Sequence, residues 1–139
     1  MAVALSSDGG DDTRRQRARL FFERAQVGAR TGNLDFAIEY FLSAIDIDPD
    51  FVEAHQCLRE VSLQRKAAGG QSLGMFETMK LRRPVVDDKA RLLRDEKLLA
   101  YEPGNIDYAN AILAAAQAMD LAETRVWAAA LVERMRGEH

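Results

Sequence analysis

The chain has 139 residues, of which 47% are hydrophobic and 29% are charged. This balance excludes a disordered or membrane-embedded chain, and the length suits a single domain. The single cysteine, Cys57, excludes an intramolecular disulfide, and the net charge of −3 argues against a protein dedicated to nucleic acid.

The N-terminal segment carries no recognisable targeting signal. Its consecutive apolar residues are few, and acidic residues follow them. A secretory signal needs an apolar stretch of about 7–15 residues, and a membrane span needs roughly 18. We therefore expect residues 1–12 to be a flexible tail, and the protein to be cytoplasmic with no membrane partner.

Two amphipathic helices are predicted between Thr13 and Pro49. Thr13 and Gln16 have the spacing of a capping box, and apolar residues then recur with helical periodicity over residues 18–29. The pair Gly32-Asn33 predicts the turn between the helices. The second helix should end before Pro49, because a residue that precedes proline is disfavoured in the helical region.

Four further helices are predicted after this hairpin. Their expected caps are Asp50, Asp87, Asn105 and Asp120. Residues 67–86 are rich in turn formers and should form an irregular insertion with at most one short helical turn. No segment alternates with a period of two, so the predicted fold class is all-α with about six helices.

The first hairpin resembles a tetratricopeptide repeat. It spans about 34 residues, the length of one such unit. The residues at the family's signature positions are Phe21, Ala25, Ala37, Phe41, Ala44 and Pro49. Arg24 and Gly28 depart from the pattern, since the family prefers leucine and tyrosine there. The string from Ser72 to Pro84 is also similar to a segment of stand-alone bacterial tetratricopeptide proteins.

The resemblance implies a right-handed superhelix of antiparallel helix hairpins over residues 13–139. The first repeat would be residues 14–49 and the third residues 104–137. The second would be residues 50–103, interrupted by the insertion at 67–86.

The resemblance also implies a non-catalytic adaptor that binds a peptide or helix of another protein in a concave groove lined by the first helix of each repeat. The expected lining residues are Arg19, Phe22, Gln26, Arg30, Glu53, Gln56, Glu60 and Gln64. An alternative interpretation is equally consistent with the sequence: the charged residues are ordinary solvent-exposed residues without a binding role, and Phe22 is a core residue.

One specificity known in the family is excluded. Its chaperone-binding members hold a terminal carboxylate with Lys, Arg and Asn side chains on successive first helices. Phe22, Gln26 and Cys57 occupy the corresponding places here, so the carboxylate would lack charge-assisted donors.

No catalytic, metal or cofactor site is expected. The histidines are His55 and His139, and Cys57 is two residues from His55, a spacing that points the two side chains in different directions on a helix. We therefore expect Cys57 to pack as a small apolar residue and His55 to lie at a groove or interface. Gly69-Gly70 lacks the Lys and Ser/Thr of a phosphate-binding loop.

Nucleic-acid binding is the alternative function, although we expect it less. Basic residues cluster over Arg14–Arg19 and Lys80–Arg83 and could contact phosphates. No aromatic residues interleave with these arginines, as single-strand binding would require.

The last predicted helix carries an apolar run from Val126 to Val132. Since a helix that is apolar on most sides is normally covered on most sides, we expect part of it to be uncovered in an isolated chain. Trp127, Leu131 and Met135 would then form a self-association or capping surface, most simply in a homodimer.

Overall fold

The computed structural model describes the backbone of residues 2–138 and the side chains of residues 10–138. This part of the chain contains seven α-helices and no strand, which confirms the all-α prediction. The helices are α1 (Ala2–Arg30), α2 (Leu34–Ile47), α3 (Val52–Ala67), α4 (Met75–Leu81), α5 (Asp88–Tyr101), α6 (Ile106–Ala118) and α7 (Ala122–Gly137). The seventh helix arises because the insertion contains α4. No described helix has the length and apolarity needed to cross a bilayer.

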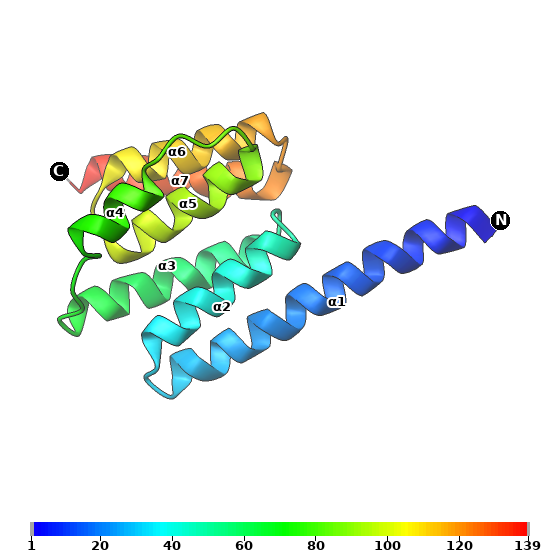
Figure 1. Cartoon of the computed structure of the whole chain (residues 1–139), viewed down its shortest axis with the longest axis horizontal. Coiled ribbons are helices and arrows are strands. Elements are labelled where there is room, and N and C mark those ends of the chain that lie inside the picture. Colours follow the sequence, from blue (N-terminus) through cyan, green and yellow to red (C-terminus); the bar gives the residue numbers. More distant parts are fainter. Residues whose placement is uncertain (1, 139) are drawn as a thin grey trace.

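The first helix is longer than predicted, since it begins at Ala2 and not at Thr13. Residues 2–12, expected to be a flexible tail, instead continue the helix. Where side chains are described, from residue 10 onward, Ala18 is the first buried residue, and residues 10–17 are all exposed. Extending a helix costs far less than nucleating one, so the packed portion after Ala18 can propagate the helix towards the N-terminus. In Figure 1, α1 projects away from the other helices at this end.

Helix directions are established by ion pairs between the elements. Lys89 lies 3.1 Å from Asp46 and Lys97 lies 3.5 Å from Glu39, so α5 runs antiparallel to α2. The hairpin turn makes α3 antiparallel to α2 as well. Consequently α3 and α5 run in the same direction, and Figure 1 shows α1, α3, α5 and α7 all parallel, with α2 and α6 opposed to them.

This parallel arrangement contradicts the prediction that residues 50–103 form an interrupted antiparallel repeat. The segment 68–87 carries the chain back along the length of α3, and α5 then starts at the same end as α3 (Figure 1). A helix of 16 residues is about 24 Å long. The connection formed by residues 68–87 is long enough to span that distance. The chain therefore forms two three-helix units, α1–α3 and α5–α7.

The core of the first unit is built from the predicted apolar stripes. Ala18 and Ala25 on α1 and Ala37 and Ala44 on α2 have no exposed surface, so the two helices approach closely. Aromatic rings fill the space between these helices and the start of α3: the ring centroids of Phe22 and Phe51 are 4.9 Å apart, and those of Phe22 and Phe41 are 5.7 Å apart.

Several helix ends are formed by the residues predicted for them. Gly32 has a φ of +82°, the left-handed conformation that glycine adopts without steric cost. The Asp87 carboxylate accepts a hydrogen bond from the Ala90 N–H, and the Asn105 side chain accepts one from the Asp107 N–H. The predicted caps Asp50 and Asp120 do not cap their own helices, which start after Phe51 and Leu121.

Candidate functional site

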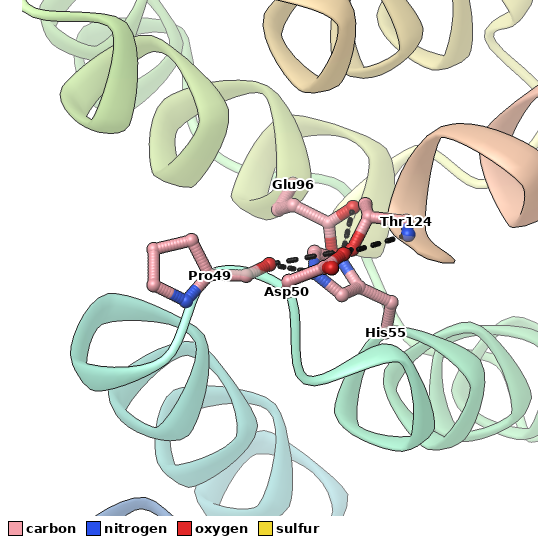
Figure 2. Close-up of polar contacts among 5 residues, drawn as sticks. All are labelled: Pro49, Asp50, His55, Glu96 and Thr124. Atoms are coloured by element: carbon pink, nitrogen blue, oxygen red, sulfur yellow. Dashed lines mark hydrogen bonds and ion pairs between the residues drawn. The ribbon is translucent and has the colours of Figure 1, made fainter. Parts of the chain in front are cut away.

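A buried polar junction connects the two three-helix units. It contains Pro49 and Asp50 from the turn before α3, His55 from α3, Glu96 from α5 and Thr124 from α7 (Figure 2). The side chains of His55 and Glu96 are 0% and 3% exposed. Buried polar groups of this kind are costly unless they are paired, and His55 and Glu96 are paired with each other through an ion-pair contact rather than a well-aligned hydrogen bond.

The imidazole of His55 lies between two acceptors. Its Nε2 atom is 2.8 Å from the Pro49 carbonyl oxygen, so Nε2 carries a proton and donates it. Its Nδ1 atom lies 3.3 Å from Oε1 of Glu96. Because Nε2 is the donor towards Pro49, an attractive contact at Nδ1 requires a second proton there or on Glu96.

The charges around His55 favour its protonated form. Burial by itself would lower the pKa of the imidazole, but Glu96, the Pro49 carbonyl and Asp50 act in the opposite direction, and the resulting pKa lies above the ordinary value. The pair is therefore a buried His–Glu ion pair that holds α3 against α5.

Asp50 attaches the N-terminus of α7 to the same junction. Its Oδ1 atom accepts hydrogen bonds from the backbone N–H and the hydroxyl of Thr124, both at 2.8 Å. Its Oδ2 atom lies 3.4 Å from the backbone nitrogen of Glu123, which donates to it. A carboxylate at this place also interacts favourably with the helix dipole. The cap of α7 thus comes from a residue more than seventy positions earlier in the chain.

The junction offers no room for a substrate. The cavity beside His55 and Glu96 has a volume of only about 10 Å³, the space of about one water molecule. His55, which we expected at a groove or interface, is instead a core residue with no exposed surface, and its Nδ1 atom has the ion-pair contact with Glu96 but no hydrogen-bond partner among the described residues. Within the described residues, no group of three or more His, Cys, Asp or Glu side chains is arranged to hold a metal ion.

An open groove lies next to this cavity, between α3 and the parallel helix α7, and shares Arg59 and Trp127 with it. It has a volume of about 370 Å³. Its lining residues are Gln56, Arg59, Glu60, Leu63, Trp127, Leu131, Arg134, Met135 and Glu138. Leu131 and Met135 are almost completely buried and form its apolar floor, whereas Leu63 is about half exposed.

Two guanidinium groups contribute positive charge to this groove. Arg59 is partly buried, and its Nη1 atom donates to the Pro103 carbonyl at 2.7 Å. Burial lowers the pKa of Arg59. The negative charge of Glu138 acts in the opposite direction, and the positive charge of Arg134 lowers the pKa further. Arg134 is exposed and forms no ion pair with any described residue. The groove therefore combines an apolar floor with charged groups of both signs.

The eight predicted groove residues are not brought together. Gln56 and Glu60 line the α3–α7 groove, whereas Glu53 and Gln64 are exposed on α3 outside it. The α1 residues Arg19, Gln26 and Arg30 do not line it. Phe22 is only 6% exposed and packs in the aromatic core, so its assignment to an open groove is wrong.

The predicted self-association surface is also largely covered within the chain. Leu131 and Met135 are 2% and 4% exposed, because α7 packs against both α6 and α3. Trp127 is partly buried, and its ring centroid lies 5.4 Å from that of His55. Of the apolar run in α7, only Val126 presents a large exposed side chain, with 68% of its surface accessible.

The two basic clusters lie on separate parts of the molecule. Arg14, Arg15 and Arg17 are exposed on the part of α1 before its first described buried residue, Ala18, and Arg19 lies over the rings of Phe22 and Phe51. Lys80, Arg82 and Arg83 are exposed at the end of α4. Among the described residues, α1 and α4 make no contact. The clusters therefore do not form one continuous surface for phosphates.

Cys57 is packed against the core, as predicted, and burial raises the pKa of its thiol. Sequence reasoning missed the Asp50 cap of α7, the His55–Glu96 pair and the Arg59–Arg134 groove. No local signal could have identified them, since each depends on which helices become neighbours.

Comparison of the chain with protein-family models, with curated proteins and with solved structures found no match.

Proposed function

We propose that this protein is a non-catalytic interaction module related in design to tetratricopeptide repeats, and that it binds a segment of another protein in the α3–α7 groove. The observation that carries the proposal is the groove itself, in which a nearly buried apolar floor is bordered by charged side chains. Protein interaction sites commonly combine a desolvated apolar centre with a polar rim.

The residues of the groove indicate what kind of segment would fit. Trp127 and Leu63 offer partly exposed apolar surface, so the segment needs large apolar side chains. Arg134 has no ion-pair partner among the described residues, and guanidinium groups bind carboxylates in a bidentate manner. We therefore infer an amphipathic segment with at least one acidic side chain placed to reach Arg134.

The position of His55 supports a non-catalytic role. A general base must come within hydrogen-bond reach of a substrate proton. His55 has no exposed surface, and the adjoining cavity of about 10 Å³ excludes a substrate. The function we propose uses the junction only to hold α3 and α7 at the spacing that opens the groove.

The proposal is tested by affinity capture with quantitative mass spectrometry, using the whole chain as bait. The groove variants are Arg134→Glu and Leu63→Glu, both at exposed positions. Matched controls at exposed positions outside the groove are Arg125→Glu and Leu20→Glu. We expect wild type and both control variants to capture a common set of proteins, and both groove variants to fail to capture that set. Identical sets captured by all five baits would contradict the proposal.

A further inference from the structure

The insertion carries an unusual concentration of exposed apolar surface. Met75, Phe76, Met79 and Val86 are 77%, 80%, 61% and 92% exposed. Four of the five most exposed large apolar side chains of residues 10–138 therefore lie within residues 75–86, which we call the apolar–basic segment. Single exposed apolar residues are ordinary on protein surfaces, but three on one short helix, Met75, Phe76 and Met79 on α4, indicate an interaction surface.

Positive charge accompanies this apolar surface. Lys80, Arg82 and Arg83 are exposed and form no ion pair with any described residue. Arg82 lines the same surface depression as Met75 and Met79, so a cation and two apolar side chains share one face. Glu77 is the single acidic residue of the segment.

The insertion that carries this segment is attached to the rest of the protein on both sides of α4. Arg65 donates a hydrogen bond to the Gln71 carbonyl at 2.7 Å, and Arg94 donates one to the Arg83 carbonyl at 3.3 Å. Leu73 and Leu81 pack against the core. Leu73 and Leu81 thus face the core, whereas Met75, Phe76 and Met79 remain exposed on α4, which lies beside α5 at the edge of the molecule (Figure 1). Lys80 also borders a depression lined by Glu39 and Asp46.

We propose that the apolar–basic segment binds the surface of an anionic lipid bilayer, with its apolar side chains among the acyl chains and its cations at the headgroups. Exposed cations beside exposed apolar side chains are complementary to a surface that is both apolar and negatively charged. An anionic bilayer is such a surface, with acyl chains beneath negatively charged headgroups. Interfacial binding depends on buried apolar area together with electrostatic attraction to anionic lipids, and the segment offers both.

This proposal differs from the expectation that no membrane partner exists. That expectation considered only continuous apolar stretches long enough for a signal sequence or a membrane span. Here the apolar residues are divided between a seven-residue helix and the loop that follows it, so no helical periodicity indicates them. The proposal is independent of the α3–α7 groove, which lies on different helices.

The test is cosedimentation of the full chain with vesicles of phosphatidylcholine alone or mixed with phosphatidylglycerol. We expect binding to the mixed vesicles that weakens as salt is added. Replacing Lys80, Arg82 and Arg83 together by glutamine should reduce the affinity roughly a hundredfold, since each cation near an anionic surface contributes about a factor of five. Phe76→Ser combined with Met79→Ser should reduce it at least tenfold. Leu20→Ser combined with Val126→Ser, which removes two exposed apolar side chains elsewhere, should leave it unchanged.

Light scattering on the same variants separates lipid binding from self-association. Absence of cosedimentation, or equal losses in the segment variants and the control pair, would overturn the proposal. A second outcome would also overturn it: wild type forms a dimer and does not bind the vesicles, and the Phe76→Ser/Met79→Ser variant is monomeric. The apolar–basic segment would then bind a second copy of the chain instead of a bilayer.

Discussion

Asp50 caps the N-terminus of α7 by accepting two hydrogen bonds at 2.8 Å from the backbone nitrogen and the hydroxyl of Thr124. Thr124 is fully buried, so these donors have no access to solvent. Asp50 lies in the turn two residues before α3, and its carboxylate therefore fixes the relative position of the N-termini of α3 and α7. The groove between these parallel helices depends on that position.

Asp50→Ala should lower the free energy of unfolding by about 2 kcal/mol, because it removes a helix cap and leaves buried donors of Thr124 unpaired. Urea denaturation followed by circular dichroism measures the change. Asp48→Ala is the matched control, since the Asp48 side chain forms no hydrogen bond or ion pair with the described residues. Equal losses in the two variants would show that the cap contributes nothing specific.

The His55–Glu96 pair should behave as a unit in a double-mutant cycle. His55→Leu and Glu96→Leu should each cost about 3–5 kcal/mol, because either change leaves an unpaired buried polar group. The double variant should cost far less than the sum, since neither group then remains unpaired. Urea denaturation can be followed through the fluorescence of Trp127, the only tryptophan and a neighbour of His55. Additive losses would mean that the two groups do not interact.

Stability should decrease as the pH rises above the ordinary histidine value near 6.5. The pKa of His55 is higher in the folded protein, so its stabilising contribution is complete below the unfolded pKa. That contribution is lost as the pH rises through the folded pKa, with a slope of at most about 1.4 kcal/mol per pH unit. Unfolding free energies measured across this interval in a His139→Gln background isolate His55. A flat or rising profile would contradict this protonation state, and His55→Leu should remove the slope.

Ala44→Leu should destabilise the first hairpin by about 1–3 kcal/mol, because Ala44 has no exposed surface and the larger side chain would overpack the core around it. Ala114→Leu makes the same change at an exposed position of α6 and should stay within about 0.5 kcal/mol of wild type. Thermal or urea unfolding distinguishes the two. Wild-type stability in the Ala44→Leu variant would show that the packing between α1 and α2 is looser than the buried alanines indicate.

Local signals in the sequence determined the helices themselves. Gly32 adopts the left-handed turn, and Asp87 and Asn105 cap the helices that follow them, because these effects involve residues only two or three positions apart. The apolar periodicity of α1 and α2 likewise identified Ala18, Ala25 and Ala44 as core positions. The turn and the caps depend on residues within one helical turn, and the buried faces follow from the period of the α-helix itself.

Tertiary structure alone decided which helices became neighbours and which carboxylates became partners. Asp50 has the residue type of a cap for α3 yet caps α7, since the return segment 68–87 makes α5 parallel to α3 and places α7 beside the turn. The same topology pairs His55 with Glu96 and assembles the groove around Arg59 and Trp127. The apolar periodicity of a helix predicts which of its faces is buried, but not which helix covers that face, because the hydrophobic effect is non-directional. The direction of α5, in turn, depends on the path of the long connection that precedes it.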